Sequence, residues 1–131
     1  MVVVIGVLAL LITGIVSIVT FSVRNSSFSQ SEAQANKYSQ EAVEWIRQQR
    51  DGGWDNIYSK ADGSVRCMQT LTLNISGNCP QSSKIADTFI REATLTRIDN
   101  DTVQIDVKVG WTDSRGTHES RTSTILTNWK K

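Results

Sequence analysis

The first 23 residues contain no charged side chain, and this feature limits most strongly what the chain can fold into. All 14 Lys and Arg and all 13 Asp and Glu lie from Arg24 onward. As an α-helix, the segment Met1 to Val23 spans about 35 Å at ~1.5 Å per residue, enough to cross a hydrocarbon core of about 30 Å. Its few polar side chains are hydroxyls, which can hydrogen-bond to the preceding helical turn. We therefore expect residues 1–23 to be the membrane-spanning half of a helix.

A cleaved secretory signal is the alternative interpretation of the same segment. Such a signal has a basic start, an apolar core of about 7–15 residues and an A-x-A cleavage site soon afterwards. This chain has no basic residue before Arg24, and its only A-x-A, Ala33-Gln34-Ala35, lies well beyond the apolar run. The composition favours a retained span.

Small residues inside this segment recur at spacings of three and four, which places them on one helical face. Small residues are common in any span, but a face made of them favours close packing against another helix, which lipid alone does not reward. We predict a helix-packing face made of Gly6, Ala9, Thr13, Ser17 and Thr20.

The helical pattern continues past Arg24 without a Pro or Gly until Asp51-Gly52-Gly53, where two glycines favour a helix end. Apolar residues form one stripe along residues 24–51, and charged residues occupy the opposite side. One helix of about 75 Å is the result, at ~1.5 Å per residue. We expect three segments: 1–23 in the membrane or a filament core, 24–51 as the amphipathic continuation, and 52–131 as a globular β head.

After Gly53 the pattern changes to alternation. The clearest strand is Thr102–Trp111, followed by the turn at 113–116 and a strand at 117–127. A strand at 88–98 precedes it, a less certain strand runs from Arg66 to Leu73, and 53–66 reads as a loop or short turn whose aromatic residues cover the core. The fold class is α+β: a long N-terminal helix packed by its second half on a three- to four-stranded antiparallel sheet. The predicted helix-to-sheet core consists of Tyr38, Ala42, Trp45, Ile46, Val103, Ile105, Val107, Val109 and Trp111.

The two cysteines, Cys67 and Cys79, enclose a short segment behind the apolar run. This arrangement favours a disulfide in an oxidising compartment, and closing such a loop stabilises the fold by about 3 kcal/mol. Two reduced thiols are the alternative. We expect no metal site, because His118 is the only histidine and the chain has no CxxC motif.

Three quoted stretches resemble the type IV pilin-like proteins, which include pilins, minor pilins and the pseudopilins of type II secretion. The stretch "MVVVIGVLALLITGIVSI" looks like the family's hydrophobic helix just after its processing site. "ANKYSQEAVEWIRQQRDGGWDNI" and "VQIDVKVGWTDSRGTHESRTSTILTNW" are similar to the helix end and final hairpin of minor pilins of the PilV type. The family's start, a glycine followed by Phe-Thr-Leu-Ile-Glu, is absent from this numbering, so no processing site can be named here.

The resemblance implies a structural subunit of a type IV pilus or secretion pseudopilus. Its partners would be other pilin-like subunits, met through the N-terminal helix. It would wait in the bacterial inner membrane as a single-pass protein with an extracytoplasmic head, and then enter a cell-surface pilus or a periplasmic pseudopilus. The alternative is a singly anchored extracytoplasmic binding or adhesion module that does not assemble.

We expect neither an enzyme nor a cofactor, because no residue pattern indicates a catalytic site, and no small-molecule ligand is evident from the sequence. The net charge of +1 gives no reason to expect bulk nucleic-acid binding. A DNA-uptake role is a third possibility, for which the basic side chains near the turns and the C-terminus would contact phosphates; ordinary solvated residues are the simpler explanation. Those residues are Arg115, His118, Arg121, Lys130 and Lys131.

Overall fold

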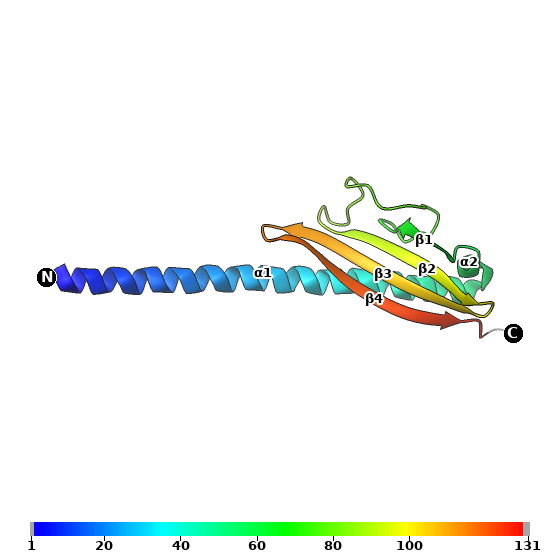
Figure 1. Cartoon of the computed structure of the whole chain (residues 1–131), viewed down its shortest axis with the longest axis horizontal. Coiled ribbons are helices and arrows are strands. Elements are labelled where there is room, and N and C mark those ends of the chain that lie inside the picture. Colours follow the sequence, from blue (N-terminus) through cyan, green and yellow to red (C-terminus); the bar gives the residue numbers. More distant parts are fainter. Residues whose placement is uncertain (1, 130–131) are drawn as a thin grey trace. The chain divides into compact units, whose positions relative to one another are not determined.

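The protein is described here by a computed structural model, which covers residues 2–129. The helix α1 spans Val2–Gly52 and the short helix α2 spans Asp55–Tyr58. Four strands follow (Figure 1): β1 (Asp62–Cys67), β2 (Ile90–Asp99), β3 (Thr102–Asp113) and β4 (Gly116–Thr127). The long N-terminal helix and the antiparallel sheet confirm the expected α+β class, an arrangement consistent with the pilin-like fold.

The chain divides into two compact units, Met1–Ala33 and Gln34–Lys131. The helix α1 contributes to both, because it continues through Arg24 and Ala33 as one helix. It ends where the sequence predicts: the backbone N–H of Gly53 donates to the carbonyls of Gln49 and Arg50, at 3.2 and 3.1 Å. Those two carbonyls have no partner further along the helix, so the bonds satisfy groups that a helix end leaves exposed.

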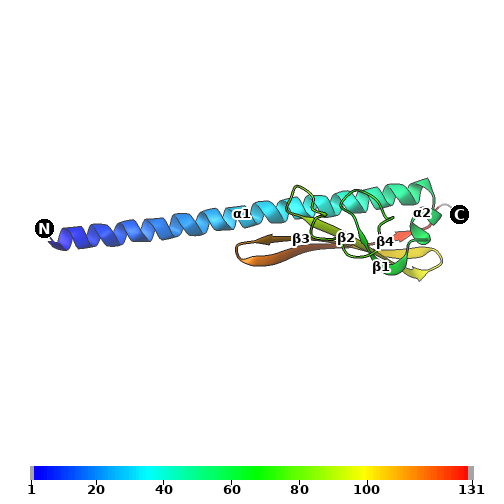
Figure 2. The ribbon, with the colours of Figure 1, turned by 90° about the horizontal axis from the view of Figure 1, so that it is seen from above.

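The second unit has two layers, the C-terminal part of α1 and the sheet (Figure 2). The strands lie in the order β1-β2-β3-β4, and each neighbouring pair is antiparallel. Alternate residues of β3 are buried, as the period of a half-buried strand requires. The face of the sheet that they form meets α1, where the rings of Tyr38 and Phe89 lie 5.3 Å apart and Ser39 Oγ donates to Thr122 Oγ1 at 2.6 Å.

The turns that join β2 to β3 and β3 to β4 form as the sequence predicts. In the first, the backbone N–H of Asp101 donates to Asp99 Oδ1 at 2.8 Å. In the second, the N–H of Arg115 donates to Asp113 Oδ1 at 2.7 Å, and Gly116 adopts a φ of 126°. Aspartate side chains thus close both turns, as such residues commonly do.

The first strand is where the sequence prediction was wrong. We expected a strand at 66–73, but β1 is Asp62–Cys67 and begins inside the stretch 53–66 that we expected to be a loop or short turn. The four-residue helix α2 lies in that same stretch. Gly63 adopts a φ of 80° and lies where the register of the β1–β2 pairing shifts, between Asp62 and Val65. A glycine at such a position in the sequence resembles a turn. Beyond Cys67 the chain leaves the sheet, and the Leu73 carbonyl accepts a hydrogen bond from Arg66 Nη1 at 3.0 Å.

Candidate functional site

The apolar part of α1 is exposed along its whole described length. Large apolar side chains from Val3 to Val23 are all at least half exposed, from 52% for Leu8 to 79% for Val3. The helix is long and apolar enough to cross a membrane, judged by length and composition. An apolar surface of this extent is unfavourable in water.

The residues of the predicted helix-packing face present little polarity. Thr13 Oγ1 donates to the carbonyls of Ala9 and Leu10, at 3.1 and 3.0 Å. Ser17 and Thr20 donate to carbonyls one turn earlier, at 3.0 and 2.9 Å. A Cβ placed on Gly6 would meet nothing within 4 Å. The hydroxyls are therefore satisfied by their own helix, and within residues 2–129 nothing occupies the space beside the glycine.

The predicted helix-to-sheet core is largely buried. Ala42, Ile46 and the five residues named on β3 are at most 4% exposed, whereas Tyr38 and Trp45 are half-buried at the margin of the layer. The alternation of apolar residues in β3 and their helical spacing in α1 predicted these contacts, because each pattern indicates which face of its element is buried.

Arg91 is a structural centre of the head that the sequence did not reveal. Its side chain is 3% exposed, and Nε donates to the Met68 carbonyl at 2.9 Å. Nη1 donates to the Tyr38 carbonyl at 3.1 Å and to Glu41 Oε2 at 2.9 Å. A lone arginine in a β-branched run reads as a solvated residue, and only the position of α1 and the cysteine loop shows otherwise.

Cys67 and Cys79 are joined by the predicted disulfide. The backbone N–H of Cys79 donates to Glu92 Oε1 at 2.9 Å, and Glu92 Oε2 lies 2.8 Å from Lys108 Nζ. Glu92 is 6% exposed. Its two side-chain oxygens therefore connect the cysteine loop to β3 from a buried position. The disulfide and this carboxylate together fix the loop against β2.

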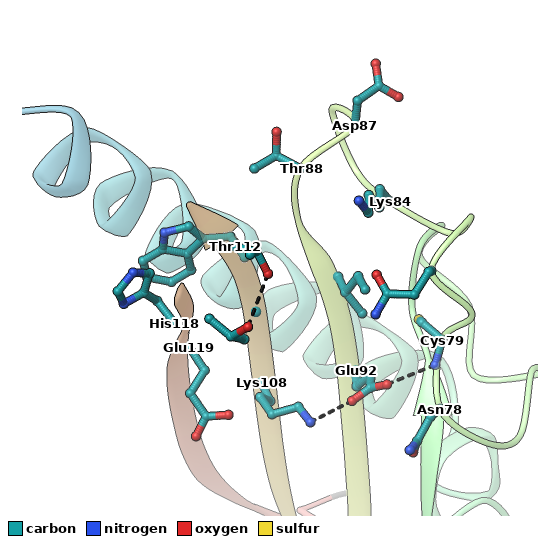
Figure 3. Close-up of a pocket in the computed structure, with 15 residues that line it drawn as sticks. Asn78, Cys79, Lys84, Asp87, Thr88, Glu92, Lys108, Thr112, His118 and Glu119 are labelled. Carbon is teal, nitrogen blue, oxygen red and sulfur yellow. Dashed lines mark hydrogen bonds and ion pairs between the residues drawn. The ribbon is translucent and has the colours of Figure 1, made fainter. Parts of the chain in front are cut away.

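A hollow of about 400 Å³ lies between this loop and the β3–β4 hairpin (Figure 3). Because Arg91 points toward α1, its neighbours Ile90 and Glu92 point to the other face of the sheet. Their cross-strand partners Gly110 and Lys108 share that face. The hollow therefore opens on the side of the sheet turned away from α1. Figure 3 places Lys84 and Thr88 on one side of it, and Thr112 and Glu119 on the other.

The basic residues considered for phosphate contact lie beside carboxylates. His118 Nε2 is 2.9 Å from Asp113 Oδ1, and this hydrogen bond is the main reason why the pKa of Asp113 is lowered. Arg121 Nε donates to Glu119 Oε1 at 2.7 Å, which lowers the pKa of Glu119. Arg115 Nε is 3.8 Å from Asp113 Oδ2. Lys130 and Lys131 fall outside the described residues.

Within residues 2–129, no group of three or more His, Cys, Asp or Glu is placed to hold a metal ion. Comparisons with protein-family models, with curated proteins and with solved structures found no match to this chain.

Proposed function

We propose that the chain is a structural subunit of a filament, a minor pilin or pseudopilin of a type IV pilus or a type II secretion-like pseudopilus. The observation that carries this proposal is the wholly exposed apolar segment of α1, which continues as one helix into a folded α+β head. A subunit that leaves a bilayer for a filament must exchange lipid contacts for helix contacts without exposing apolar surface to water.

The satisfied hydroxyls and the small residues of the packing face support close contact with neighbouring helices. The disulfide supports an extracytoplasmic head, because such bonds persist in oxidising compartments. In this proposal the chain waits in the inner membrane as a single-pass protein and meets other pilin-like subunits through residues 1–23.

The test enlarges side chains on the packing face and keeps the segment uncharged and apolar. Gly6→Leu and Ser17→Leu should leave membrane insertion intact but reduce incorporation into fibres. Gly14→Leu is the matched control, because Gly14 lies off this face and a Cβ there also meets nothing within 4 Å. Membrane fractionation measures insertion, and immunoblotting of sheared filaments measures incorporation. Normal incorporation of both packing-face variants would remove the basis of the proposal.

A singly anchored binding module that does not assemble is the second candidate, favoured by the hollow on the head. This candidate predicts that residues 2–23 can be replaced by any equally apolar helix. A Leu/Ala segment of the same length should then preserve every property of the chain, whereas a filament subunit with that segment should insert in the membrane and fail to assemble.

A further inference from the structure

Gly110 occupies a position where no contact among the described residues requires a glycine. It lies inside β3, three residues before the end of the strand, and is paired with Ile90 on β2 and Glu119 on β4. Its φ is not positive, and a Cβ there would meet only the His118 carbonyl oxygen at 3.6 Å, an ordinary contact. Glycine weakens a strand interior and commonly marks a place where a ligand approaches the backbone. The missing side chain leaves the floor of the hollow open.

The wall beside this floor is bonded to the rest of the head at both ends. The disulfide holds one end of it, and Ile85 and Phe89 hold the other through two backbone hydrogen bonds of 2.7 and 3.0 Å. Between them Ala86 and Asp87 adopt φ values of 48° and 57°, a left-handed conformation that the surrounding bonds maintain. A hollow with a fixed wall binds a ligand without first ordering a loop, which favours affinity.

The charges around the hollow are largely compensated within the chain. Lys108 pairs with Glu92 at 2.8 Å, and Glu119 accepts from Arg121 at 2.7 Å. On the rim, Lys84 and Asp87 carry opposite charges. A ligand therefore meets no strong demand for net charge of either sign, which disfavours an anion or a cation as its natural occupant.

The groups left to face a ligand are amides and hydroxyls over a small apolar floor. Asn78, Gln81 and Thr88 line the hollow from the loop. Thr117 lines it from β4, where its hydroxyl is 3.3 Å from the Thr112 hydroxyl. Amides and hydroxyls both donate and accept hydrogen bonds, so they suit a ligand that does the same. A pyranose ring combines hydroxyl edges with a C–H face that can lie on Ile90 and Gly110. The volume of about 400 Å³ is within the range of small-molecule sites.

We propose that this hollow is a binding site for a neutral saccharide of one or two rings, with Gly110 as its floor and Asn78, Gln81 and Thr88 as hydrogen-bonding partners. All residues of this site belong to the head unit. A subunit that assembles and one that does not would both carry it.

The experiment uses the full chain in a zwitterionic detergent without sugar headgroups. Saturation-transfer NMR is recorded with glucose, galactose, mannose, N-acetylglucosamine, N-acetylgalactosamine, lactose and cellobiose, and with glucuronic and sialic acids as charged comparisons. At least one neutral sugar should show transfer at its ring C–H protons. Gly110→Val should abolish this transfer, whereas Gln104→Val, on the same face of β3 and outside the hollow, should preserve it.

Gln81→Ala gives a second variant that does not disturb the sheet, because Gln81 is exposed on the loop. We expect it to weaken binding about tenfold, the size of one lost ligand hydrogen bond. The proposal is overturned if none of the neutral sugars binds. It is equally overturned if binding survives both Gly110→Val and Gln81→Ala, or if only the charged sugars bind. None of these results bears on fibre incorporation, which is measured separately.

Discussion

Arg91 joins three parts of the head that are far apart in the sequence: the Met68 carbonyl, the Tyr38 carbonyl and the Glu41 carboxylate. Replacing it by methionine keeps much of the side-chain volume but leaves two carbonyls without this donor. We expect Arg91→Met to lower the free energy of unfolding by about 2–3 kcal/mol, since Glu41 is half exposed and water recovers part of its loss. Chemical denaturation followed by tryptophan fluorescence measures the change.

Glu41→Gln is the matched control for Arg91, because it removes the charge but keeps an oxygen that accepts the hydrogen bond. It should cost about 1 kcal/mol or less, as expected for a half-exposed pair. Equal effects of the two substitutions would show that the ion pair, rather than the bonds to the two carbonyls, gives Arg91 its stabilising role.

Asp62 makes the head sensitive to acid. The Ser64 hydroxyl and then the Ser64 backbone N–H donate to its carboxylate, and they lower the pKa of Asp62 from 3.8 to about 2. Because the folded state favours the charged form, this contribution to stability is complete above pH 3.8 and is lost as the pH falls toward about 2. Ser64→Ala should raise the pKa of Asp62 toward 3.8, measured by NMR titration of its side-chain carboxyl carbon.

An unchanged titration curve in Ser64→Ala would contradict this account of Asp62. Asp62→Asn provides the stability control: its unfolding should lose the pH dependence that Asp62 contributes, while the bond from Ser64 to the remaining side-chain oxygen persists.

At the scale of elements, the cysteine loop is held on the sheet by covalent and hydrogen bonds. The disulfide joins two cysteines that are 12 positions apart in the sequence. Next to it, the Met68 N–H donates to the Arg91 carbonyl at 2.9 Å. Replacing both cysteines by alanine should lower the free energy of unfolding by about 3 kcal/mol, because the unfolded chain regains the freedom of the open loop. Denaturant titration of the two proteins measures the difference.

Cys67 and Cys79 are 1% and 9% exposed, so reductant should reach them only when the head opens. The control is the unaltered protein under mild reducing conditions, which should retain its disulfide and its stability without denaturant. If the double alanine variant matched the unaltered protein in stability, the loop would be held by its hydrogen bonds alone.

At the scale of the whole molecule, the two units require unlike surroundings. Residues 3–23 expose apolar side chains, whereas the head buries its own core. Ile12 lies near the middle of the uncharged segment, and Ile12→Arg should raise the cost of membrane insertion by about 2.5–3.5 kcal/mol. The fraction of chain that resists alkaline extraction from membranes should fall accordingly.

Ser27→Arg carries the same new charge beyond the uncharged segment, so it should behave as the unaltered chain does. If Ile12→Arg resisted extraction equally well, residues 1–23 would not be the part that anchors the chain.

Local pattern predicted most of the fold. The alternation in β3, the two aspartate turns and the double glycine at the end of α1 each depend on residues close in sequence, and the structure confirms them. The sequence did not predict the first strand correctly. Gly63 and the register shift between Asp62 and Val65 resemble a turn when only neighbouring residues are considered. The sequence did not predict the hollow either, because the residues that line it come from four separate segments: the loop, β2, β3 and β4.

The sequence by itself determined the apolar and polar halves of α1 and the faces of the strands, because periodicity and composition indicate which side chains water disfavours. It favoured a disulfide between Cys67 and Cys79, and the structure shows that bond. The tertiary structure alone decided the role of Arg91 and the exposure of Gly110 at the floor of the hollow. Those depend on which distant segments meet, and sequence spacing along one strand carries no information about a neighbour dozens of residues away.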